Sequence, residues 1–293
     1  MIKPQTIQWP KISIITPSFN QGSFLDQTIQ SVLAQNYPNL EYIVMDGGST
    51  DESLEIIRRY EPSLSHWEST PDEGQYDAIQ KGFSHTDGEV MGYLNSDDLY
   101  YPWTLRVVGE VFATFPQVEW LTTSCTSATP IDAKFPLVYA RYNRSRRRFL
   151  ETRGKLFRKR DFLQQESTFW RRSLWDKAGA RLDTHLKYAG DFELWARFFE
   201  HTSPVTVNIP LAMFRFHGSQ KTTNPDEYIA EAEDVLSRYP RPFWVPMSFI
   251  RFLNLIFLRT QSEADWLGAR CDRVEYDPRE NCWNYRKYLE WRE

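Results

Sequence analysis

Apolar residues in the first hundred positions occur either in short continuous runs or at helical spacing. A short run rich in β-branched residues predicts a buried strand, and apolar positions three and four residues apart predict an amphipathic helix. We expect strands at 11–16, 40–46, around 66–67 and at 90–94, and helices at 23–35, 49–60 and 74–83. Strands that alternate with helices of this length predict an α/β fold with a Rossmann-like, mainly parallel central sheet flanked by helices.

The second half of the chain has a less regular pattern. Loops and strands are expected at 119–140, a strand entering a helix at 167–175, a helix at 190–200 and strands ending in a polar turn at 205–222. From Pro225 onward the chain is expected to be helical and peripheral. One helix start is also predicted: Ser49 followed by Glu52 is the pattern of a capping box.

Polar residues follow three of the predicted strands at the point where each strand ends. The segment "PSFN" (17–20) follows the first strand, "DGGSTD" (46–51) the second and "NSDD" (95–98) the fourth. In open parallel sheets, ligands bind beyond the carboxyl ends of the strands. The three clusters are therefore expected to lie along one edge of the sheet and to form a binding site.

The cluster at 95–98 ends in two adjacent carboxylates, Asp97 and Asp98, directly after a buried strand. Ionised carboxylates near a core are costly unless a positive group pairs with them. One interpretation is a hard divalent cation, Mg²⁺ or Mn²⁺, which prefers oxygen ligands and often shares carboxylates with substrate phosphates. The alternatives are that the two residues cap the helix expected near Pro102, or that they pair with an arginine.

Two further residues of the clusters have a chemical and a structural interpretation each. Asp46 can accept hydrogen bonds from a base imide or a ribose hydroxyl, or it can be a turn aspartate that binds its own backbone. Phe19 can stack on a nucleobase or pack in the core. The glycines of "DGGSTDES" match neither a dinucleotide-binding fingerprint nor a phosphate-binding P-loop.

Composition and charge add limits to this picture. A chain of 293 residues allows two domains or one large α/β domain. Its three cysteines, Cys125, Cys271 and Cys282, form no CxxC pair, which fits a reducing compartment and argues against a zinc site of thiolates.

The net charge is −4, yet residues 141–160 hold ten Arg or Lys and one acid. This segment predicts either a solvated loop or a patch for anionic lipid or a diphosphate, and the acidic remainder argues against nucleic acid.

No segment is long and apolar enough to predict a transmembrane helix, and the N-terminal residues do not resemble a secretory signal. The most apolar stretch, 243–259, is interrupted by Pro246, Arg251 and Asn254. It is expected to be a helix that packs on the main domain or lies in a membrane interface. The expected location is therefore cytoplasmic, including a peripheral position on the inner face of the membrane.

Several motifs occur in order along the chain: "ISIITPSFNQGSFLDQTIQSVLAQNYPNLEYIVMDGGSTD", "DEGQYDAIQKGF", "GYLNSDDLYYP", "QQESTFWRRSLWDKAG", "YAGDFELWARF" and "FRFHGSQKT". Together they closely resemble the family 2 glycosyltransferases, which have the GT-A fold. The resemblance covers roughly residues 10–222. It implies a nucleotide-sugar-binding half at 10–120, an acceptor-binding half at 121–222 and a C-terminal helical extension at 223–293.

The resemblance also implies a role for each matching residue. Asp191 is the expected catalytic base, and Asp97 and His217 are expected to hold Mn²⁺ or Mg²⁺. The acceptor side is assigned to Gln165, Glu166 and Asp98. The residues expected to bind the nucleotide are Pro17, Ser18, Phe19, Asn20, Asp46, Gln75, Asp77 and Ser96.

The sequence departs from the family pattern at two positions. Asn95 stands at the first position of the Asp-x-Asp motif, which leaves Asp97 as its main carboxylate. Gly190 stands where the family has the acid of a Glu-Asp pair, so that only the aspartate is kept.

The function implied is inverting transfer of a sugar from a UDP-, GDP- or dTDP-linked donor to a saccharide or lipid-linked acceptor, as in polysaccharide biosynthesis. Two other functions stay open: a catalytically silent sugar-nucleotide-binding or scaffold protein, and a sugar-1-phosphate nucleotidyltransferase. The second would need a basic, glycine-rich loop after the first strand, and "TPSFNQGSF" has no such cation.

Overall fold

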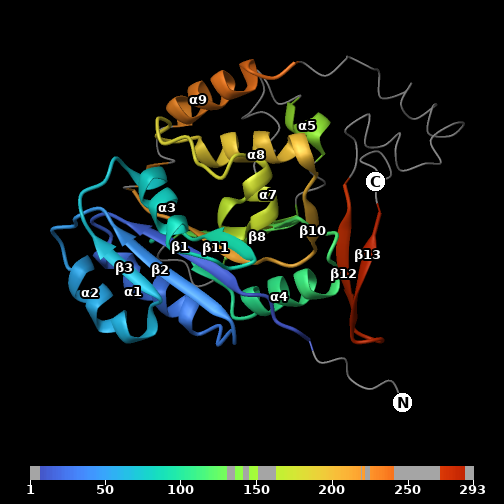
Figure 1. Cartoon of the computed structure of the whole chain (residues 1–293), viewed down its shortest axis with the longest axis horizontal. Coiled ribbons are helices and arrows are strands. Elements are labelled where there is room, and N and C mark those ends of the chain that lie inside the picture. The colour runs from blue at the N-terminus through green and yellow to red at the C-terminus, as the bar shows by residue number, and fades with distance from the viewer. Residues whose placement is uncertain are drawn as a thin grey trace, which may run out of the picture.

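The computed structural model describes residues 7–130, 136–140, 145–150, 163–218, 220–221, 225–240 and 271–287. These residues form a nine-stranded sheet, with helices on both faces, and a second sheet of four strands (Figure 1). The predicted α/β class is therefore confirmed.

The large sheet is mostly parallel, as the alternating pattern predicted. Strand β1 pairs in parallel with both β2 and β4, and β3, at the edge of the sheet, adds in parallel to β2. The exceptions are the C-terminal hairpin β12–β13 and β9, which is antiparallel to both of its neighbours, β4 and β6. In spatial order the strands are β13 (Cys282–Arg286), β12 (Arg273–Asp277), β10 (Val205–Val207), β6 (Trp120–Thr123), β9 (Phe169–Arg171), β4 (Val90–Tyr93), β1 (Ile12–Ser18), β2 (Leu40–Asp46) and β3 (His66–Ser69).

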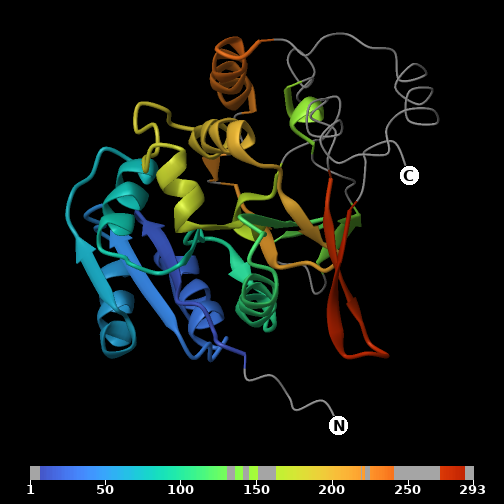
Figure 2. The ribbon, with the colours of Figure 1, turned by 45° about the vertical axis from the view of Figure 1, so that its right-hand side comes forward.

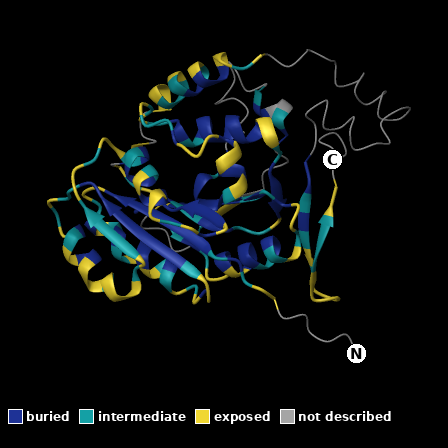
Figure 3. Ribbon diagram, in the orientation of Figure 1, coloured by how far each residue is buried: buried dark blue, intermediate teal, exposed yellow. Residues whose placement is uncertain are grey.

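Two layers of helices bury the two faces of this sheet (Figures 1 and 2). One face is covered by α1 (Gly22–Leu33), α2 (Ser53–Tyr60) and α4 (Thr104–Thr114), and the other by α3 (Gln75–Ser84), α7 (Arg172–Lys177) and α8 (Gly190–His201). Side chains at helical spacing, such as Leu25, Ile29 and Val32 of α1, are fully buried. The central strands are buried along their length, whereas the helices expose their outer sides (Figure 3).

The second sheet brings residues from the far half of the chain to the end of β4. Its strands, in spatial order, are β5 (Leu99–Tyr100), β11 (Ala212–Phe216), β7 (Cys125–Pro130) and β8 (Leu137–Ala140). Strand β5 directly follows the 95–98 cluster and pairs antiparallel with β11. The residues after β11 therefore lie beside that cluster.

The remaining described elements are short or peripheral. They are η1 (Glu61–Ser63), α5 (Arg146–Leu150), η2 (Gln165–Ser167) and α9 (Pro225–Ser237). Helix α9 packs on α8, on the same side of the sheet (Figure 1).

Two local predictions are wrong. Helix α2 begins at Ser53, because the Ser49 hydroxyl binds the Asp46 carboxylate instead of capping a helix. The region after Pro225 is helical in α9, but 273–286 forms the β12–β13 hairpin, which extends the large sheet. Segment 243–259 and most of the basic run at 141–160 lie outside the described residues. Among the residues described, no helix is long and apolar enough to cross a bilayer.

Candidate active site

A cavity of about 790 Å³ lies at the carboxyl ends of β1, β2 and β4. Its wall includes Pro17 and Ser18 at the end of β1, Phe19 directly after it, and Asn95, Ser96 and Asp97 after β4. The glycines of the second cluster, Gly47 and Gly48, complete this side. The prediction that the three polar clusters meet at one edge of the sheet is confirmed.

Five of the residues assigned to a nucleotide line the cavity: Pro17, Ser18, Phe19, Gln75 and Ser96. Phe19 is 59% exposed, so its ring is available for stacking rather than packed in the core. The Ser18 hydroxyl is buried and has no hydrogen-bond partner among the described residues. The Gln75 side chain donates to Asn95 Oδ1 at 2.6 Å, which fixes the Asn95 amide next to Asp97.

The other three residues assigned to the nucleotide hold the surrounding loops. Asp46 is 3% exposed, and its carboxylate accepts hydrogen bonds from Ser49 and from the Ser69 hydroxyl. It is therefore a turn aspartate in this structure. Asn20 has a φ of 52°, and its side chain accepts a hydrogen bond from the Thr50 backbone.

Asp77 lies in the first turn of α3 and does not line the cavity. Its carboxylate accepts the backbone N–H of Glu73 at 3.0 Å and pairs with Lys81 at 2.8 Å. These contacts order the loop that leads into α3, which itself contributes to the cavity wall.

Asp97 and Asp98 are adjacent in sequence but have different partners. Asp97 lines the cavity, and its Oδ2 lies 2.9 Å from His217 Nε2. The His217 ring is itself stacked on Phe24, with 4.4 Å between the ring centroids. A carboxylate oxygen of the cavity wall thus lies beside the imidazole nitrogen of a neighbouring residue.

Asp98 is fully buried and does not line the cavity. Its Oδ1 accepts the backbone N–H of Arg215 at 3.0 Å, and its Oδ2 has no hydrogen-bond partner among the described residues. Burial, and then the charges of Glu166 and Asp97, raise the pKa of Asp98 well above its usual value, while Arg215 opposes this shift. The assignment of Asp98 to the acceptor stays a prediction, and its positively charged neighbour in this structure is Arg215.

Arg215 is the buried cation of this region, with 3% of its surface exposed. Its guanidinium donates to the Asp97 carbonyl, to Gln27 Oε1 at 2.6 Å and to Thr28 Oγ1 at 3.0 Å. It also lies over the Phe24 ring. Arg215 thus joins β11, α1 and the 95–98 cluster into one polar network beneath the cavity.

Asp191 lies in the first turn of α8, and one of its carboxylate oxygens is buried without a hydrogen-bond partner among the described residues. Burial raises the pKa of Asp191 to about 7, and the backbone amides of Phe192 and Asp191 partly offset that effect. The residue that precedes the helix is Ala189, so Asp191 is not a helix cap. A partly buried carboxyl with a pKa near neutrality is suited to accept a proton.

The segment before Asp191 is held from two sides. Glu231 of α9 accepts the backbone N–H groups of Lys187, Tyr188 and Ala189 at 2.8–2.9 Å. The Tyr76 hydroxyl donates to the Tyr188 carbonyl at 2.7 Å. These contacts fix where α8 begins and therefore where the Asp191 carboxylate lies.

Gln165 and Glu166 lie in η2, beneath this side of the site, and both are buried. Gln165 donates to the Tyr93 carbonyl at 2.7 Å, and Glu166 accepts from Gln164 at 2.8 Å. Burial raises the pKa of Glu166 to about 7, and the charges of Asp97 and Asp191 add to the shift. Asp97, Glu166 and Asp191 are thus close enough to interact electrostatically.

Two charged residues of the cavity wall were not identified from the sequence. Asp72 lines the wall, and burial raises the pKa of its carboxyl. The Lys221 ammonium donates to Gln75 Oε1 at 3.0 Å and places a positive charge on the wall. Both lie inside motifs that carried the resemblance, "DEGQYDAIQKGF" and "FRFHGSQKT".

The chain is similar to known glycosyltransferases in sequence and in fold. Residues 13–176, more than half of the chain, match the sequence model of the family described as "Glycosyl transferase family 2". An uncharacterized glycosyltransferase of Mycobacterium tuberculosis is 41% identical over 92 residues, which cover 31% of this chain and 35% of that protein. The chain thus spans about a third of the length of this relative.

Two solved structures share the fold. Residues 1–349 of S. aureus TarS, in complex with UDP-GlcNAc, superpose with a TM-score of 0.56 at 16% identity, covering 87% of this chain and 78% of that one. The mannosyltransferase PcManGT of Pyrobaculum calidifontis, in complex with GDP-Man and Mn²⁺, superposes with a TM-score of 0.51 at 15% identity, covering 91% and 87%.

Proposed function

Because the chain belongs to glycosyl transferase family 2, we propose that it transfers a sugar from a nucleoside diphosphate donor to a hydroxyl group of a saccharide or lipid-linked acceptor. The observation that carries the proposal is the cavity at the strand ends, with the Asp97 carboxylate in its wall. The two similar structures are complexes with UDP-GlcNAc and with GDP-Man, which supports a UDP- or GDP-linked donor.

The proposed reaction is a single displacement with inversion at the anomeric carbon. The acceptor oxygen attacks C1 of the sugar, the bond from C1 to the diphosphate oxygen breaks, and the hydroxyl proton moves to Asp191. The Asp191 oxygen that has no hydrogen-bond partner among the described residues is suited to receive that proton. Lys221 and the exposed ring of Phe19 would orient the diphosphate and the base of the donor.

Asp97 at the cavity wall and the adjacent His217 fit a divalent metal. Asp97 Oδ2 and His217 Nε2 are 2.9 Å apart, close to the separation of two neighbouring ligands of one octahedral ion, which is about 3 Å for bonds of about 2.1 Å. A carboxylate with an imidazole suits Mn²⁺ at least as well as Mg²⁺. When bound, the metal would supply charge that stabilises the departing diphosphate.

We expect Asp97→Ala to abolish metal-dependent donor binding. Isothermal titration calorimetry with UDP, GDP and dTDP should show that one nucleotide binds the wild type at least about tenfold more tightly with Mn²⁺ than without it, a difference of about 1.4 kcal/mol. The variant should bind that nucleotide equally weakly under both conditions, because the carboxylate that shares the ion with the diphosphate is gone.

Asp234→Ala is the matched control for this titration. Asp234 is an exposed acid of α9 that pairs only with Arg238, so the variant should behave as the wild type. A nucleotide affinity that is the same with and without Mn²⁺, and the same in the wild type and in Asp97→Ala, would contradict a metal at the cavity wall. Release of pyrophosphate from a nucleoside triphosphate would instead favour the nucleotidyltransferase, and tight donor binding with neither transfer nor hydrolysis would favour a silent protein.

The pH dependence follows from the raised pKa of Asp191. The base must be ionised to accept a proton, so kcat/KM is expected to rise with pH and to level off above about pH 7.

Asp191 and Glu166 both have raised pKa values, so the folded chain binds more protons than the unfolded chain between their ordinary pKa values near 4 and about 7. Their contribution to stability is therefore present at low pH and is lost as the pH rises through 7.

Urea denaturation at pH 5.5 and pH 8 measures this second effect. The Glu166→Gln variant should show a smaller difference in unfolding free energy between the two pH values than the wild type. An activity profile that is flat from pH 5.5 to pH 8 would contradict the assignment of a base with a pKa near 7.

A further inference from the structure

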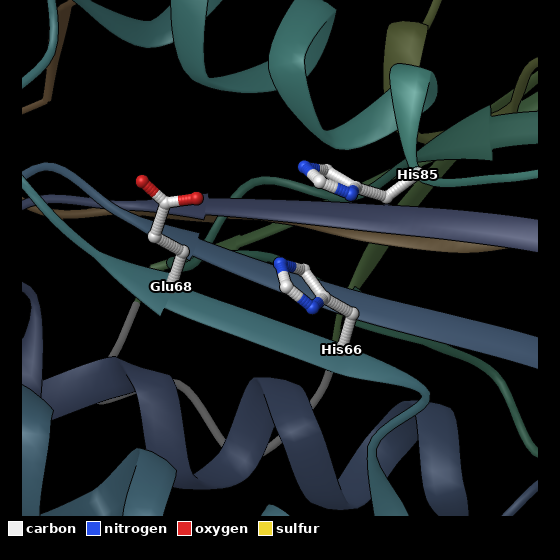
Figure 4. A group of neighbouring side chains, drawn as sticks. All are labelled: His66, Glu68 and His85. Carbon is white, nitrogen blue, oxygen red and sulfur yellow. The ribbon is translucent and has the colours of Figure 1, made fainter.

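Two histidines and a glutamate meet on the outer edge of the large sheet, away from the cavity. His66 and Glu68 are two residues apart on β3, so their side chains project from the same face of the strand. His85 immediately follows α3 and reaches toward them (Figure 4). One ligand atom from each residue lies within 4.8 Å of the ligand atoms of the other two.

The contacts of these side chains leave ligand atoms directed at one another. The imidazole rings are stacked with 4.3 Å between centroids, and His66 Nε2 is buried with no hydrogen-bond partner among the described residues. In Figure 4, the His66 ring and one carboxylate oxygen of Glu68 point toward the gap below the His85 ring. A buried nitrogen without a partner loses hydration free energy that a ligand at this position would restore.

We propose that His66, Glu68 and His85 form a second metal site, distinct from the cavity, for a borderline divalent cation of the Zn²⁺ type. Two imidazoles and one carboxylate are a donor set that binds zinc, whereas Mg²⁺ and Ca²⁺ prefer oxygen ligands throughout. The remaining coordination position would be taken by water, since three protein ligands leave a tetrahedral ion one place short.

The site needs only a small closure to accept the ion. Bonds of about 2.0–2.1 Å in a tetrahedral site place ligand atoms about 3.4 Å apart, so ligand atoms that lie within 4.8 Å must approach one another by up to about 1.4 Å. His85 is exposed, which leaves its side chain room to rotate. Glu68 Oε1 accepts the Thr70 hydroxyl at 2.5 Å, and its second oxygen is left for the ion. The nearby Lys81 ammonium pairs with Asp77 rather than with Glu68.

The position of the site indicates what the ion would do. Helix α3 has ten residues, about 15 Å in length, with Gln75 at the cavity and His85 just beyond the opposite end. An ion at His85 would tie that end of α3 to β3. The connection between β3 and α3 carries Pro71 and Asp72 of the cavity wall. By holding β3 and α3 together, the ion would stabilise this part of the wall without contacting a substrate.

The test is Zn²⁺ titration of the full, tag-free chain by calorimetry, with no donor or acceptor present. The wild type should bind one Zn²⁺ per chain at this site, and His85→Ala should bind it at least about 100-fold more weakly, since even loss of a residue that only supports a ligand costs 10–100-fold in affinity. Glu68→Gln, which keeps the size of the side chain, should weaken binding in the same way. Zn²⁺ should raise the melting temperature of the wild type but not of His85→Ala.

Two controls separate this site from other histidines and from the cavity. His185→Ala removes an exposed histidine elsewhere and should bind Zn²⁺ as the wild type does. Asp97→Ala should also keep the ion, because Asp97 belongs to the cavity. Undiminished Zn²⁺ binding by His85→Ala, or loss of the ion in Asp97→Ala alone, would overturn the proposal. Neither result depends on the proposed transfer activity.

Discussion

Replacement of Asp191 by Asn is expected to slow sugar transfer by about 10²–10⁴-fold while leaving donor binding nearly unchanged. Asparagine has the same shape as aspartate but cannot accept the acceptor proton. The measurement is release of the nucleoside diphosphate, with the nucleotide identified by calorimetry and a panel of saccharide and lipid-linked acceptors. Only kcat should fall, because Asp191 is assigned to the reacting hydroxyl and not to the donor.

Asp176→Asn is the matched control, since Asp176 is an exposed aspartate of α7 and should have full activity. Stability gives a second readout. Because burial raises the pKa of Asp191, its ionised form is disfavoured in the folded chain, and Asp191→Asn should unfold at the same or a higher urea concentration than the wild type at pH 8. Full transfer activity in a folded Asp191→Asn variant would show that the base is another residue.

Replacement of Arg215 by Met is expected to lower the free energy of unfolding by about 3–5 kcal/mol, as measured by urea denaturation at pH 7. Methionine fills much of the space of the arginine but removes its charge and all of its hydrogen-bond donors. The loss leaves the buried Asp98 without its cation, and it leaves the Asp97 carbonyl and Gln27 without their donor. Unpaired buried polar groups of this kind are costly.

Arg59→Met provides the contrast for this measurement. Arg59 pairs with Asp26 at 2.8 Å on the surface, with 64% of its side chain exposed, and such pairs contribute about 1 kcal/mol or less. If Arg215→Met were no more destabilised than Arg59→Met, the buried network would not be what holds the 95–98 cluster in place.

Hydrophobic periodicity was sufficient to predict the first half of the large sheet, because each strand and helix there has a regular apolar pattern. The meeting of "PSFN", "DGGSTD" and "NSDD" followed from a general property of parallel sheets, and the cavity is at that position. What the pattern could not give was the partner of each polar side chain. Asp98 and Arg215 are 117 residues apart in sequence, and only the pairing of β5 with β11 brings them together.

Local sequence patterns gave wrong predictions where the contacts of the folded chain differ from those that the pattern implies. Ser49 has the sequence context of a helix cap, yet its hydroxyl binds Asp46, which also receives the Ser69 hydroxyl from β3. The C-terminal hairpin was missed because its pairing with β10 depends on a distant part of the chain. Glu231 gave no signal either, since its role comes from the packing of α9 beside α8.

The departure at Gly190 has a physical explanation. A Cβ atom at this position would lie 2.7 Å from the Tyr76 ring, which is closer than such atoms approach in proteins. Tyr76 is buried there, and its hydroxyl holds the Tyr188 carbonyl. The Tyr76 ring therefore requires glycine at position 190. It occupies the space that the acidic side chain of the family pattern would need.

Strand β9 has a consequence for the order in which this chain can fold during synthesis. It is only three residues long, yet it is the link between the β3-β2-β1-β4 block and the β6-β10-β12-β13 block. All strands of the first block have left the ribosome by Tyr93, so that block can pair early, while β4 keeps an open edge until Phe169–Arg171 emerge. An open strand edge invites pairing with other chains. The interval between these two points of synthesis is therefore when the nascent protein is most exposed to misassembly.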